Sequence, residues 1–188
     1  GTIQGRHEKK IASMKEGDVL LFGDECGIQA VPSRIQAWAL KGHTPTIPNP
    51  GGREKINVIG AVEPATGVVT AAFIPKLTAV VFLAFLKHVI RRYIHARKIY
   101  LVVDNAKSHH AKLLEPFLKL AAWKLELLFL PPYSPELNPA EDFWKFLREK
   151  CTHNTYYEHF KDKVAVVREF LVKCKNPSDE VRSRCHYK

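Results

Sequence analysis

The chain has 188 residues, of which 46% are hydrophobic and 26% charged, and its 29 Lys and Arg against 19 Asp and Glu give a net charge of +10. This composition is typical of one globular domain, and it excludes a disordered tail, a coiled-coil rod and, since the apolar runs are short, a membrane span of about 20 residues. The excess of positive charge indicates a polyanionic partner, most commonly nucleic acid, although a basic protein without such a partner is the alternative.

The first half of the chain predicts mainly β-structure. Asp18–Gly23 is apolar on both faces, as expected for a buried strand, and ends at Asp24. Lys41–Gly52 is rich in proline and glycine, which predicts a loop. Further strands are expected at Gln36–Lys41, which alternates in polarity, and at Lys55–Val62 and Val68–Ile74, which flank a turn.

The second half predicts alternating helices and strands. Thr78 is the expected N-cap of a helix that runs to about Tyr93. The next elements are a strand at Ile99–Val103, a helix at His110–Ala122 that Pro116 kinks or limits, a strand at Leu125–Leu130, and helices at Pro139–Lys150 and Tyr157–Cys174. Hairpins followed by strand–helix alternation favour an α/β fold with a mixed five-stranded sheet, its first three strands antiparallel, flanked by helices.

Acidic residues follow two of the predicted strands. Asp24 and Asp104 would meet at one sheet edge if these strands are neighbours, and two close carboxylates must then share a proton or a cation. Magnesium prefers such oxygen ligands. Taken singly, each aspartate is explained more simply as a turn or cap residue. Glu141, three residues after Asn138, is likewise explained as a helix-capping glutamate, so only the three acids together suggest a site.

Three motifs that contain these acids occur in a fixed order. They are LFGDE at 21–25, VVDNA at 102–106 with His109 after it, and LPPYSPELNPAEDFW at 130–144. Together they resemble the DDE transposases of the mariner-type superfamily, especially its bacterial insertion-sequence branch. Trp38 with Gly42, and NVIGA at 57–61, are similar to that branch as well, so the resemblance covers about residues 15–155.

The resemblance implies a fold, a reaction and a catalytic triad. The fold is ribonuclease H-like, and the reaction is DNA cleavage and strand transfer with two Mg²⁺ or Mn²⁺ ions, with TA as the target dinucleotide. Asp24, Asp104 and Glu141 match the three acids, with 36 residues between the second and the third. In this scheme Asp24 bridges both ions, Asp104 binds one of them and Glu141 the other.

Further residues are candidates for supporting roles. Asn105 and His109 either orient the metal site or a phosphate, or serve as turn and helix-start residues. Glu25 is expected on the opposite strand face from Asp24, and Trp144 is expected to pack its helix on the sheet rather than to stack on a base. The candidate DNA contacts, each of which is also consistent with a plain solvated surface, are Lys41, His43, Arg53, Lys55, Lys145 and Arg148.

The extent of the resemblance and of the predicted elements divides the chain into three parts. Residues 1–15 are a remnant or linker too short for a helix-turn-helix unit, residues 16–175 the catalytic domain, and residues 176–188 a polar tail that frays. The expected partners are transposon ends, target DNA and a second or further copy, with no membrane. The expected location is the cytoplasm of a bacterium or archaeon, at the nucleoid, or the nucleus of a eukaryote.

Two other functions fit parts of these observations. One is a domesticated or degenerate core that binds DNA without cutting it, and the other is a different nuclease of the same fold. The four cysteines form no CxxC pair, which predicts free thiols rather than disulfides or a zinc site.

Overall fold

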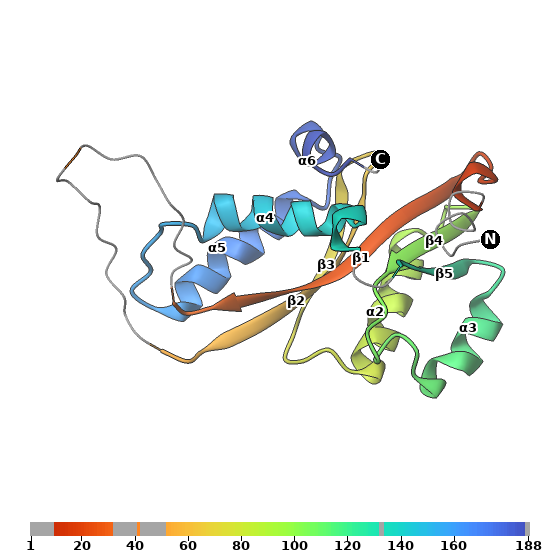
Figure 1. Ribbon diagram of the computed structural model, residues 1–188, viewed down its shortest axis with the longest axis horizontal. Helices are drawn as coiled ribbons and strands as arrows, with labels where there is room; N and C mark the ends of the chain where they lie inside the picture. The colour runs from red at the N-terminus through yellow and green to blue at the C-terminus, as the bar shows by residue number, and fades with distance from the viewer. Residues whose placement is uncertain (1–9, 32–40, 42–51, 132–133, 187–188) are drawn as a thin grey trace.

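A five-stranded mixed sheet forms the centre of the computed structural model, which describes residues 10–31, 41, 52–131 and 134–186 (Figure 1). The strand order is β3-β2-β1-β4-β5, with β1–β2 and β2–β3 antiparallel and β1–β4 and β4–β5 parallel. The bounds are β1 Asp18–Gln29, β2 Lys55–Glu63, β3 Val68–Ile74, β4 Lys98–Val103 and β5 Leu125–Phe129. The predicted mixed sheet with three antiparallel first strands is confirmed.

Helices cover both faces of the sheet (Figure 1). On one face lie α2 (Ala79–Arg92) and α3 (Glu115–Ala121), the latter preceded by a short 3₁₀ turn, η1 (Lys112–Leu114). On the other lie α4 (Pro139–Cys151), preceded by the 3₁₀ turn η2 (Pro135–Leu137), then α5 (Phe160–Lys173) and α6 (Asp179–Arg184).

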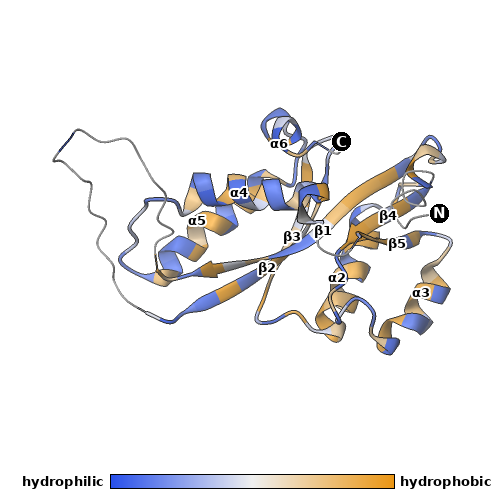
Figure 2. Cartoon of the chain, in the orientation of Figure 1, coloured by the Kyte–Doolittle hydropathy of each residue, from blue (hydrophilic) through white to orange (hydrophobic). Residues whose placement is uncertain are grey.

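An apolar core lies between the sheet and the helices on each of its two faces, because neighbouring residues of a strand point to opposite faces. Leu21 belongs to the core under α2, whereas Phe22 belongs to the core under α4. The parallel strand β4 alternates in the same way, and its apolar residues lie beside those of β1 in the sheet (Figure 2). Within the described ranges, none of the helices has the length and apolarity that a membrane crossing requires.

The strand β1 is longer than predicted. It continues past Asp24 to Gln29, because its second half pairs with β2 from Glu25↔Ile59 to Gln29↔Lys55. The prediction that Asp24 ends a strand is therefore wrong, and this residue lies in the middle of β1. The end of β1 is held by Lys163 of α5, whose buried ammonium donates hydrogen bonds to three successive backbone carbonyls, those of Gln29 (2.9 Å), Ala30 (2.8 Å) and Val31 (3.3 Å).

Two other segments differ from their predictions. The helix expected at His110–Ala122 begins only at Glu115, with Pro116 in its first turn, where the missing N–H needs no partner. The segment expected to be a polar tail forms α6, whose Val181 is buried, and whose N-cap Ser178 donates its backbone N–H to the carbonyl of Thr66 at 3.0 Å. The strand predicted at Gln36–Lys41 lies outside the described residues except for Lys41, which is an exposed turn residue.

Candidate active site

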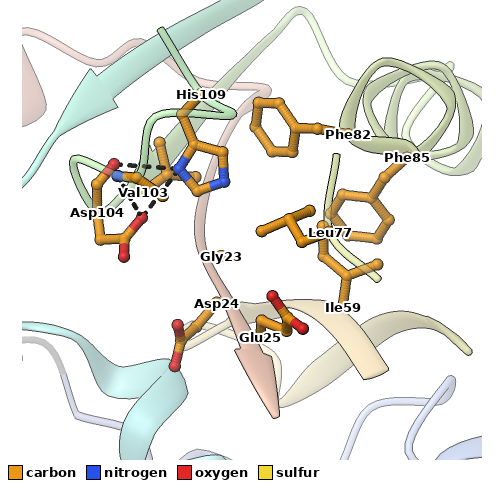
Figure 3. A pocket seen from close by; sticks show the side chains of 11 residues that line it. Gly23, Asp24, Glu25, Ile59, Leu77, Phe82, Phe85, Val103, Asp104 and His109 are labelled. Atoms are coloured by element: carbon orange, nitrogen blue, oxygen red, sulfur yellow. Dashed lines mark hydrogen bonds and ion pairs between the residues drawn. The ribbon is translucent and has the colours of Figure 1, made fainter. Parts of the chain in front are cut away.

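Asp24 projects from β1 towards the start of α4. Its neighbours at two residues, Phe22 and Cys26, belong to the core under α4, so the carboxylate lies on that face. The parallel register pairs Phe22 with Val102, which brings Asp104, just after β4, level with Asp24. Glu141 lies in the first turn of α4. Figure 3 shows Asp24 and Glu25 pointing apart, as the strand alternation predicted.

Asp24 is half-buried and lies within the electrostatic influence of the other two acids. Burial raises the pKa of Asp24 from 3.8 to about 7, and the negative charges of Glu141 and Asp104 add to this rise. A backbone N–H of Glu25 and the indole of Trp144 act in the opposite direction. Among the residues that the structure describes, no three His, Cys, Asp or Glu side chains are gathered closely enough to hold a metal ion as they stand.

Asp104 is exposed and is held from one side by His109. The Nδ1 of His109 lies 2.9 Å from the Asp104 carboxylate and 3.1 Å from its backbone carbonyl, and since both are acceptors, Nδ1 carries a proton. The ring is buried against Phe82, with centroids 4.2 Å apart. The hydrogen bond from His109 holds the pKa of Asp104 below its ordinary value. His109 therefore fixes the orientation of this acid, and its role towards a metal stays a prediction.

Asn105 connects the ends of two parallel strands. Its amide donates to the carbonyl of Leu130, just after β5, at 2.6 Å. Its Oδ1 lies 3.2 Å from Nε2 of His110, whose ring stacks on Phe129. Both polar atoms of the Asn105 side chain are thus bonded within the chain, next to Asp104. Its contact with a metal or a phosphate stays a prediction.

The start of α4 is joined directly to β1 beside Asp24. Asn138 caps the helix by accepting a hydrogen bond from Ala140 N at 3.2 Å, as its sequence position predicted. Its amide nitrogen also approaches the carbonyl of Gly23 at 3.5 Å. This second contact, which sequence reasoning missed, fixes the helix that carries Glu141 to the strand that carries Asp24.

The cations proposed for DNA binding lie on different surfaces. Lys145 pairs with Asp142 at 2.9 Å on the exposed side of α4, and Arg148 donates to the Cys26 thiol at 3.3 Å. Lys55 extends along Gly27, on the face of β1 opposite to α4, because a side chain at Gly27 would collide with its Cε at 2.8 Å. Arg53 and Lys41 are exposed, and His43 lies outside the described residues.

A small cavity of about 100 Å³ lies beside the acids on the α2 side of β1 (Figure 3). Phe82 and Phe85 of α2 form its apolar wall, and Glu25 and His109 give it polar groups. The carboxylate of Asp24 points away from it, so this cavity is not the place where the three acids meet. All four cysteines are buried free thiols, as predicted.

The strand order and the two helical layers define a ribonuclease H-like domain of the kind found in transposase catalytic domains. The isolated catalytic domain of the Mos1 mariner transposase has this fold, with a TM-score of 0.64 at 15% identity, over 97% of this chain and 82% of that one. The chain belongs to the DDE superfamily endonucleases, whose family model matches residues 19–163.

Two of the proteins that this chain resembles are considerably longer than the chain itself. A 39 kDa protein of insertion element IS630 from Shigella sonnei is 28% identical over 152 residues, which are 81% of this chain and 44% of the relative. The Mos1 transposase paired-end complex with the left transposon end matches with a TM-score of 0.71 at 18% identity, over 97% of this chain and 55% of that one. The chain therefore spans about half the length of these relatives.

Proposed function

We propose that this chain is the catalytic core of a transposase, which cleaves DNA and transfers the cut strand with divalent metal ions held by Asp24, Asp104 and Glu141. The observation that carries the proposal is the pairing of β1 with β4, which brings Asp24 level with Asp104. The start of α4, which carries Glu141, is held against the same strand, and the raised pKa of Asp24 agrees with this arrangement. A half-buried carboxylate that feels the charge of two other acids is a site that a cation stabilises, since it neutralises their mutual repulsion.

The donor set fits Mg²⁺ or Mn²⁺, because both ions take carboxylate oxygens and keep water or phosphate as further ligands. Paired-end complexes of the Mos1 transposase have been solved with Mn and with Mg, which supports the same choice here. When bound, two such ions activate a water or a 3′-hydroxyl and stabilise the leaving oxygen at phosphorus.

The chain's own residues have distinct tasks in this scheme. Asp24 gives up its proton as a cation enters, so metal binding should release protons near neutral pH. His109 holds the carboxylate of Asp104, and Asn138 holds the start of α4, and with it Glu141, against β1. Because no metal cluster is preformed among the described side chains, DNA phosphates are expected to complete the ligand set.

DNA ends and a second or further copy of the chain are the partners that we propose for this core. The Mos1 transposase forms a paired-end complex with its left transposon end, which supports this choice. The net charge of +10 favours contacts to phosphate, and Lys145 and Arg148 are the α4 cations on the side of Glu141. Such binding should weaken steeply as the salt concentration rises.

The experiment combines calorimetry with Mn²⁺ and nicking of supercoiled plasmid by the same protein. The wild type should bind Mn²⁺ and nick the plasmid, Asp104→Ala should lose metal binding, and Glu141→Gln should lose nicking. Glu25→Gln is the matched control, because this acid lies on the opposite face of β1 and should leave both properties intact.

A wild-type protein that neither binds Mn²⁺ in the presence of plasmid nor nicks it would overturn the proposal. Retained, salt-sensitive DNA binding in that case would indicate the non-cleaving DNA-binding function. Preferential cleavage of an RNA–DNA hybrid would indicate a ribonuclease H instead.

A further inference from the structure

Trp144 places an unused hydrogen-bond donor next to the candidate site. It lies on α4 one turn after Glu141, and only 1% of its surface is exposed. Its indole Nε1 is fully buried and has no hydrogen-bond partner among the described residues. A buried donor without a partner is costly, so its retention calls for a physical reason.

The carboxylate of Asp24 is the acceptor to which we assign this donor. Asp24 pairs with Gly60 in the sheet, and the Trp144 ring lies over Gly60, so the indole is beside Asp24, although its N–H does not reach hydrogen-bond geometry in this structure. An ionised carboxylate accepts such a bond more strongly than a neutral one does.

Gly60 determines how deeply the indole ring sits. It pairs with Asp24 in the register of β1 and β2, so the two residues lie side by side in the sheet. A Cβ at Gly60 would lie 2.7 Å from Cη2 and 3.0 Å from Cζ2 of Trp144, closer than packed carbon atoms approach. The ring therefore occupies the space that any other residue at position 60 would fill.

We propose that Trp144 is a positioning residue for Asp24: its indole N–H holds one carboxylate oxygen, which leaves the other oxygen for the metal. Gly60 provides the space that this orientation needs. The inference rests on the proposed metal-dependent function, and it adds to that function a residue that acts on the metal only through Asp24.

The first test compares Trp144→Phe with Phe143→Leu. Phe143 is buried beside Trp144, with ring centroids 5.1 Å apart, and stacks on Phe170, so its truncation removes packing without removing the donor. Trp144→Phe should bind Mn²⁺ about tenfold more weakly by calorimetry, the effect of one lost hydrogen bond to a charged acceptor. Phe143→Leu should change the affinity less than about twofold, even where urea denaturation shows a similar loss of stability.

Kinetics and a second variant separate positioning from packing. In plasmid nicking, Trp144→Phe should lower kcat about tenfold and leave KM for DNA unchanged, since the residue does not contact DNA in this scheme. Gly60→Ala keeps the N–H but displaces the ring, so it should weaken Mn²⁺ binding in the same direction.

A spectroscopic test needs no change at position 144. In a Trp38→Phe/Trp123→Phe protein, Trp144 is the sole tryptophan, and saturating Mg²⁺ should change its emission. The change should disappear in the same protein with Asp24→Asn. If Trp144→Phe does not fold, this measurement decides.

The outcomes distinguish the two proposals. A wild type that shows neither Mn²⁺ binding nor nicking overturns the proposed function. A wild type that binds Mn²⁺, with Trp144→Phe equal to it, overturns only the positioning role. Unchanged Trp144 emission in a protein that demonstrably binds Mg²⁺ overturns it as well.

Discussion

Replacing Asp24 by asparagine should make the metal-free protein more stable at alkaline pH. Burial, with the charges of Glu141 and Asp104, raises the pKa of Asp24 from 3.8 to about 7. Between these values the unfolded chain has lost its proton and the folded chain keeps it, so the free energy of unfolding falls as pH rises. Above pH 7 the loss is complete, and at 1.36 kcal/mol per pH unit it amounts to at most about 4 kcal/mol.

Asparagine carries no charge, so it avoids this loss. Urea denaturation in EDTA should show the advantage of Asp24→Asn over the wild type growing by about 2–3 kcal/mol between pH 5 and pH 8. Glu25→Gln, which removes a carboxylate from the opposite face of β1, is the matched control and should show no such growth. Saturating Mg²⁺ at pH 8 should stabilise the wild type and not Asp24→Asn, so the difference in their free energies of unfolding should become smaller. An advantage that is absent, or equal at the two pH values, would refute the reasoning.

Three further predictions concern the supports of the site and of the sheet. His109→Ala should lower stability at pH 6, and the part of this loss that comes from the bond to Asp104 should shrink as pH falls below 3.8, since that bond stabilises only the ionised acid, as urea denaturation across this range would show. Lys163→Met should cost about 2–3 kcal/mol, because three buried carbonyls lose their donor, whereas the exposed Lys161→Met should stay within about 0.5 kcal/mol. Val181→Ala should cost about 2 kcal/mol in the same assay if α6 is an integral part of the fold, and no loss would show that α6 is not docked in solution.

The elements that the sequence predicted well are those with local signals. The helix α4 has an Asn138 cap followed by proline, and α2 has a Thr78 cap whose side chain accepts from Val81 N at 3.2 Å. Both starts were predicted correctly because a cap acts on the next three residues. The three acids were proposed in the same way, from the short motifs that contain them, and their catalytic role stays a prediction.

Other features depended on partners far away in the chain. The contact between Asn138 and Gly23 spans 115 positions, and the space that Gly60 leaves for Trp144 involves two separate elements. Neither has a local signal. The extension of β1 did have a local signal. The buried Cys26 and Ile28 alternate with the exposed Gly27 and Gln29, as in a strand that is covered on one face. The helix α6 also had one, in Ser178 followed by two acids.

The cap at Asn138 also has a consequence for how the protein is made. Asp24 and Asp104 lie 80 positions apart, and Glu141 follows only in α4. The parallel pairing of β1 with β4 must close a long loop, which is slow, and α4 must in addition dock on Gly23 of β1. A growing chain that ends before residue 138 thus holds two of the acids on an incomplete fold. The proposed DNA cleavage therefore needs a chain that extends through α4 and has docked this helix on β1.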